Sequence, residues 1–168
     1  MTSLRFDEPG GRTLHICIVP YREPTLVEDG YVEEILPGAF RDQVEEARNR
    51  SLRVWLHREH RDEDNVVGHA TSLHDLAGGL YGLFNVHAGI AGDQALAAIR
   101  AGKLVGASLQ AKSLRSRTVN GVTQRQKVHL GGVALVPNSA YPAARVVGIR
   151  KAQSGDQAGP ASTDEAEL

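Results

Sequence analysis

The chain has 168 residues, of which 41% are apolar, and its 19 Lys and Arg residues nearly balance 20 Asp and Glu residues for a formal net charge of −1. This length suffices for one domain with its own core and is too short for two of ordinary size. The balanced charge excludes a basic footprint, so we expect no nucleic-acid partner. No apolar run approaches the roughly 20 residues of a membrane-spanning helix, so we expect no membrane partner. The only cysteine, Cys17, lies in an apolar run and no secretory signal precedes it, which favours a reducing intracellular setting.

The first half of the chain predicts β-strands with one helix among them. The strand segments are rich in β-branched and apolar residues and stop at proline or polar turn residues. Phe40, Val44 and Ala47 instead share one face at helical spacing. The predicted elements are a strand over 12–21, a short strand over 31–36, a helix over 39–50 and a strand over 51–56. This last strand carries two histidines, His57 and His60, at its end.

The second half of the chain predicts more strands and a second helix. The predicted elements are strands over 66–72 and 79–87, a helix over 93–101, and long strands over 104–116 and 121–136. Polar and glycine residues predict a turn over 74–79. Asn120-Gly121 is a strong hairpin signal, so it joins the two long strands. Many strands, two short helices and little alternation between them predict an α+β, mainly β fold: an antiparallel β-barrel with a few helices packed outside.

The composition changes after Arg150. Residues 151–168 lack apolar periodicity and end in several acidic side chains. Such a segment cannot bury enough surface to offset the entropy lost on ordering. We therefore expect one β-barrel domain over 1–150 and a disordered tail over 151–168.

Ser108 and His60 are the candidate nucleophile and base. Ser108 follows Gly106 and Ala107, whose small side chains leave room around its hydroxyl, and His60 closes a strand start in a charged turn. A serine needs a base within about 2.6–3.2 Å, and imidazole suits because its pKa lies near 6.5. Backbone donors for an oxyanion would come from the loop after Val136. From local sequence alone, a serine satisfied by backbone and a solvated loop histidine remain the ordinary alternatives.

His57 competes with His60 for the role of base. The pair also permits a metal interpretation, because two imidazoles three residues apart can share a zinc ion. No cysteine pair or third spaced ligand accompanies them, and Glu59 stands at the wrong offset for a His-Glu-x-x-His metalloprotease. We therefore predict no metal and no cofactor, and a metal-dependent hydrolase is the weaker alternative. Structural or solvent roles are expected for the scattered histidines His15, His69, His74 and His87.

Five sequence blocks occur in an order that resembles a known family. They are Glu34-Ile35-Leu36-Pro37-Gly38-Ala39-Phe40, the strand ending in a histidine with Gly68 after it, Gly79-Leu80-Tyr81, the run 102–108, and the terminal run 133–146. This order resembles the prohead (procapsid) maturation proteases of tailed bacteriophages, whose fold is similar to that of the herpesvirus assemblin serine proteases. The resemblance spans roughly residues 10 to 150.

The resemblance implies a serine endopeptidase on a β-barrel, which places the nucleophile at Ser108 and the catalytic histidine at His60. The implied substrates are segments of the scaffolding and major capsid proteins, and the chain itself. Cleavage would occur inside the assembling procapsid, in the host cytoplasm, and a homo-oligomer is expected.

One departure from the family concerns the third catalytic residue. Many members have an acidic residue just before the last motif, where this chain has Gly132. The assemblin proteases use a second histidine as third member, so the resemblance points to His129, on the same predicted strand, as the residue that orients His60. The missing acid also keeps open an alternative function: a non-catalytic procapsid- or scaffold-binding module on the same fold.

Overall fold

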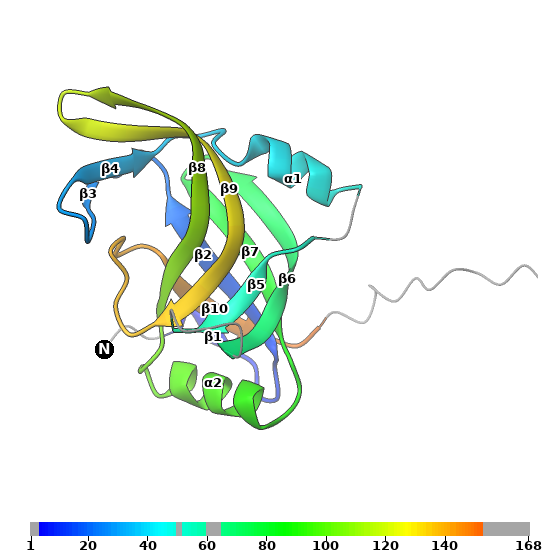
Figure 1. Cartoon of the computed structure of the whole chain (residues 1–168). Coiled ribbons are helices and arrows are strands. Elements are labelled where there is room, and N and C mark those ends of the chain that lie inside the picture. Colours follow the sequence, from blue (N-terminus) through cyan, green and yellow to red (C-terminus); the bar gives the residue numbers. More distant parts are fainter. Residues whose placement is uncertain (1–3, 50–51, 60–64, 153–168) are drawn as a thin grey trace, which may run out of the picture.

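The computed structural model describes residues 4–49, 52–59 and 65–152, and its main feature is a closed barrel of seven strands (Figure 1). These strands are β2 (Thr13–Pro20), β5 (Trp55–Arg58), β6 (Val66–Leu76), β7 (Gly79–Val86), β8 (Gly106–Val119), β9 (Val122–Val136) and β10 (Arg145–Arg150). Around the barrel the order is β2-β7-β6-β5-β9-β8-β10, and β10 closes it by pairing with β2. The predicted mainly β barrel is confirmed. The barrel is not wholly antiparallel as predicted, because β5 and β9 pair in parallel.

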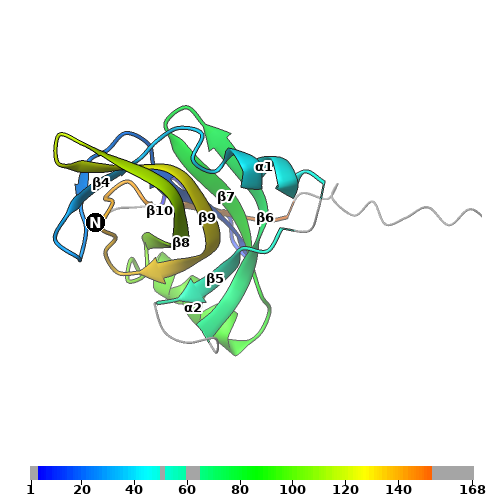
Figure 2. The same cartoon turned by 45° about the horizontal axis from the view of Figure 1, so that its top comes forward.

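The remaining elements lie around the barrel. They are β1 (Phe6–Asp7), β3 (Thr25–Leu26), β4 (Val32–Ile35), α1 (Arg41–Ala47) and α2 (Ile90–Arg100). β4 pairs in parallel with the start of β9, where the β8–β9 hairpin extends beyond the barrel (Figures 1 and 2). The two helices lie near opposite ends of the barrel. Neither helix in the described part of the chain is long and apolar enough to cross a membrane.

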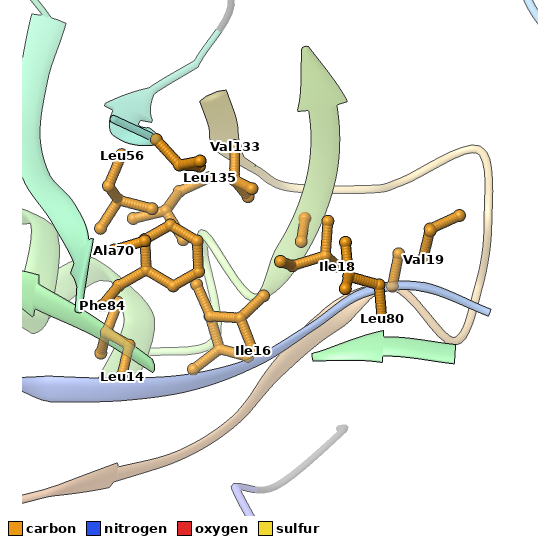
Figure 3. Close-up of a cluster of buried hydrophobic side chains, with 14 of the residues drawn as sticks. Leu14, Ile16, Ile18, Val19, Leu56, Ala70, Leu80, Phe84, Val133 and Leu135 are labelled. Atoms are coloured by element: carbon orange, nitrogen blue, oxygen red, sulfur yellow. The ribbon is translucent and has the colours of Figure 1, made fainter. Parts of the chain in front are cut away.

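The barrel interior is filled by apolar side chains from all seven strands. Figure 3 shows Phe84 of β7 among side chains of β2, β5 and β9, and its side chain is fully buried. Successive residues of a strand point to opposite faces, so the interior positions alternate with outward ones. On β5, Leu56 points into the core, which turns Trp55 and His57 to the outside. The candidate site therefore lies on the outer surface of the barrel.

α1 covers a gap along one edge of β9. β4 pairs with residues 122–125 of β9 and β5 pairs with residues 132–135, which leaves the stretch between them without a strand on that side. The Gln43 amide fills the place of a strand, since its Nε2 donates to the Leu130 carbonyl (2.6 Å) and its Oε1 accepts from the Leu130 N–H (2.8 Å). The Val128 N–H donates to the Ala39 carbonyl (2.9 Å).

Replacing Gln43 with alanine should destabilise the fold by about 2 kcal/mol, because it leaves both backbone groups of Leu130 without their partner at a buried position. The free energy of unfolding from urea titration measures this loss. Gln94→Ala on the exposed face of α2 is the matched control and should change it by less than about 0.5 kcal/mol. Equal losses in the two variants would contradict this role of Gln43.

The hairpin prediction is confirmed in detail. β8 ends at Val119 and β9 begins at Val122, so the connection has two residues. Asn120 and Gly121 have φ angles of 49° and 77°, the left-handed pair that a type I′ turn requires.

Several predicted bounds differ from the observed ones. α1 spans 41–47 rather than 39–50, because Gly38, at φ 86°, belongs to a turn before the helix. β5 spans 55–58 rather than 51–56, since its pairing with β9 and β6 sets its position. β6 continues to Leu76 and β7 begins at Gly79, so the turn that was predicted over 74–79 consists of Ala77 and Gly78. β10 was not predicted as a strand of its own. Most of the predicted tail, residues 153–168, lies outside the described residues.

Candidate active site

Three rows of paired residues cross β5, β9, β8 and β10 on the outside of the barrel. The first row is Trp55, Gly132 and Gln110; the second is His57, Ala134 and Ser108; the third is Val136, Gly106 and Arg145. Directly paired residues of neighbouring strands point to the same side of a sheet. Their neighbours in sequence, including Leu56, Ala107 and Val133, lie in the core. We call this surface the three-row face.

Ser108 is half-buried in the middle row of the three-row face. Its partner Ala134 is fully buried, and glycines occupy positions 106 and 132 in the flanking rows. His57 lies on the other side of Ala134, two strands from Ser108, which corresponds to about 10 Å between the two Cα atoms. The fold therefore brings the end of the histidine-carrying strand level with the predicted nucleophile.

The His57 ring points towards the first row, which contains Gly132 and Gln110. Its Cδ2 atom is 3.2 Å from the place that a Cβ atom on Gly132 would occupy, and Gln110 Oε1 is 2.6 Å from the same place. An acidic side chain at position 132 would have to displace both groups. The resemblance leads one to expect an acidic residue at position 132, and in this chain the His57 ring and the Gln110 amide occupy the space that its side chain would need.

The described chain leaves the sheet directly after His57 and Arg58. The Glu59 N–H donates to the Leu135 carbonyl (2.8 Å), and Leu135 pairs with Ala107, the neighbour of Ser108. Glu59 then has a φ of 60°, a turn conformation. The next residue, His60, lies outside the described residues. Its contact with Ser108 therefore stays a prediction.

The structure does not bring His129 to Ser108. His129 pairs with Lys112, four positions along β8 from Ser108, or about 13 Å in an extended strand. It is exposed and lines a groove of about 690 Å³ with α1 residues such as Gln43 and Glu46. The expectation that His129 orients the base gains no support from this register, because Ala134, and not His129, stands level with the serine.

Two groups that suit an oxyanion lie at the third row: the Ser139 nitrogen, which is close to Gly106, and the side chain of Arg145. The loop after β9 passes over Gly106, where the Ser139 nitrogen is 3.0 Å from the place of a Cβ atom. Arg145 pairs directly with Gly106 and thus shares the outer face with Ser108. Backbone N–H groups and guanidinium groups near a nucleophile stabilise developing negative charge. The sequence predicted oxyanion donors in the loop after Val136. It did not predict Arg145, because no pattern near Arg145 in the sequence shows that it pairs with Gly106.

Among the other histidines of the described residues, His69 borders this face, because it pairs with Trp55 across β5 and β6. His69 Nδ1 lies 2.8 Å from His87 Nε2, and Ser72 contacts His74. Burial and the charge of Arg150 lower the pKa of His15, which stacks on Phe6. Within the described ranges, no three His, Cys, Asp or Glu residues are grouped so as to hold a metal ion. The His57–His60 alternative includes a residue outside those ranges.

No protein-family model matches the chain, and no curated protein matches it.

Proposed function

We propose that this protein is a serine endopeptidase of viral capsid maturation, with Ser108 as nucleophile and His60 as general base. The observation that supports the chemistry is the middle row of the three-row face. It sets the end of the strand that leads to His60 level with a half-buried serine on an accessible surface. The resemblance of the sequence blocks supports the substrates, namely segments of the scaffolding and major capsid proteins and of the chain itself.

In the proposed reaction, the Ser108 Oγ attacks the carbonyl carbon of the scissile peptide bond while the imidazole of His60 takes its proton. The negative charge moves to the carbonyl oxygen, and the Ser139 N–H and the Arg145 guanidinium are the candidate groups that stabilise it. The C–N bond then breaks, and the imidazolium gives its proton to the leaving amine. Water, activated by the same imidazole, hydrolyses the acyl-enzyme and releases Ser108.

A fluorophosphonate probe tests this proposal directly, because it modifies serines that a neighbouring base has activated. We expect a single adduct on the peptide that contains Ser108, seen by mass spectrometry. Ser108→Ala should lose the adduct, whereas Ser113→Ala, at an exposed serine of the same strand, should keep it. Absence of any adduct on the folded protein would favour the non-catalytic scaffold-binding module over the protease.

A further inference from the structure

The only tryptophan of the chain lies on the three-row face. Trp55 is 47% exposed although tryptophan is usually among the better-buried side chains. It stands two residues before His57 on β5 and so points to the same side of the sheet. The other large apolar side chains that are exposed in the described part of the chain belong to other surfaces or to the outer part of the β8–β9 hairpin: Leu26, Leu76, Ile90, Leu114 and Val119.

The surroundings of Trp55 suit an extended peptide. Its row partner on β9 is Gly132, which is buried and has no side chain, and the neighbouring Gly131 is exposed. The Gln110 amide lies over Gly132, where it can exchange hydrogen bonds with the backbone of a bound chain. An exposed aromatic ring and a side-chain amide therefore lie side by side, one row from Ser108.

The charge around Trp55 indicates which kind of ligand side chain its ring can bind. An indole ring binds apolar groups and cations, since a cation is attracted to its face. Arg53 precedes Trp55 by two residues, so it lies on the same side of the extended chain, and the described part of β5 carries no acidic residue. Its positive charge disfavours a lysine or arginine of the ligand at this position. The ligand side chain that fits this position is apolar.

We propose that Trp55 is a specificity determinant that binds an apolar side chain of the substrate peptide. Trp55 lies two strands and one row from Ser108, so their Cα atoms are about 12 Å apart. An extended peptide advances about 3.3 Å per residue, which places the apolar side chain three or four residues from the scissile bond. This inference rests on the proposed peptidase function and adds the chemical class of its substrate.

Cleavage of a peptide library made from a digested bacterial proteome tests the inference. New peptide ends are sequenced after incubation with the wild type, Trp55→Ala, Trp55→Phe and Leu114→Ala. We expect wild-type cuts to be enriched in an apolar residue at one position three or four residues from the bond. Trp55→Ala should lose this enrichment and lower kcat/KM on the best library peptide by about 10- to 100-fold, mainly through KM. Trp55→Phe should keep most of the apolar enrichment and of kcat/KM. Leu114→Ala, at an exposed apolar residue of β8, should match the wild type in both.

Two readouts separate this inference from the proposed function. Fluorophosphonate labelling of Ser108 should be unchanged in Trp55→Ala, because the ring contacts substrate and not the nucleophile. In the Ser108→Ala protein, binding of the best library peptide should shift the emission of Trp55, the sole tryptophan. Cuts without apolar preference, or a preference that survives in Trp55→Ala, would overturn the inference and leave the peptidase intact. A wild type that cuts no library peptide would overturn both.

Discussion

Replacing Ser108 with alanine should abolish cleavage of the scaffolding and major capsid proteins. Without the Oγ atom no acyl-enzyme can form, so we expect a loss to background rather than a slower reaction. Ser108 points away from the core and is only half-buried, and the change removes one atom without opening a cavity. Its effect on the free energy of unfolding should stay within about 1 kcal/mol. Co-expression with the two substrate proteins, followed by intact-mass measurement, shows whether they are processed.

Ser113→Ala is the matched control for this experiment. It removes the same atom from an exposed serine of β8 on the hairpin, away from the three-row face, and should leave processing unchanged. Both variants should unfold at nearly the wild-type temperature. Processing by a folded Ser108→Ala protein would exclude Ser108 as the nucleophile and leave the fold without an assigned function.

The parts of the fold that the sequence predicted are those with local causes. The turn at Asn120-Gly121 depends on two residues that accept left-handed conformations, and apolar, β-branched segments elsewhere in the chain indicate strands. β10 was not predicted, although three of its six residues, Val146, Val147 and Ile149, are β-branched. It is a strand because it pairs with β2 and β8, which lie far from it in sequence, and this closure is a property of the whole barrel.

In the candidate site, too, some features follow from the local sequence and others depend on how distant strands pair. The small residues around Ser108 are visible in the sequence, and the strand alternation that turns His57 outward also turns Trp55 outward, so Trp55 had a usable signal. His129 shows the limit. A shift in the β8–β9 register near Gly131 and the parallel pairing of β5 with β9 decide which residue stands level with Ser108, and neither follows from spacing along the chain.

The second large effect on the cleavage rate is expected from replacing His60, and it separates His60 from His57 as the base. We expect His60→Ala to lower kcat/KM for capsid-protein cleavage by roughly 10⁴-fold or more, as loss of the base does in serine hydrolases. His57→Ala should cost less than about tenfold, because the His57 ring lies beside Gly132, two residues along β9 from the level of Ser108. Steady-state cleavage of one peptide by each purified variant provides the comparison.

Two features make this comparison decisive. Both variants lose one imidazole, and the two positions are three residues apart in the sequence, so a general effect of removing a ring there would lower both rates equally. His129→Ala, at an exposed histidine about 13 Å along the strands from the row of Ser108, controls for histidines of β9 and should leave the rate near wild type. If His57→Ala abolished cleavage and His60→Ala were mild, then the middle row itself would hold the dyad, and the His57 ring would have to turn from Gly132 towards Ser108 for catalysis.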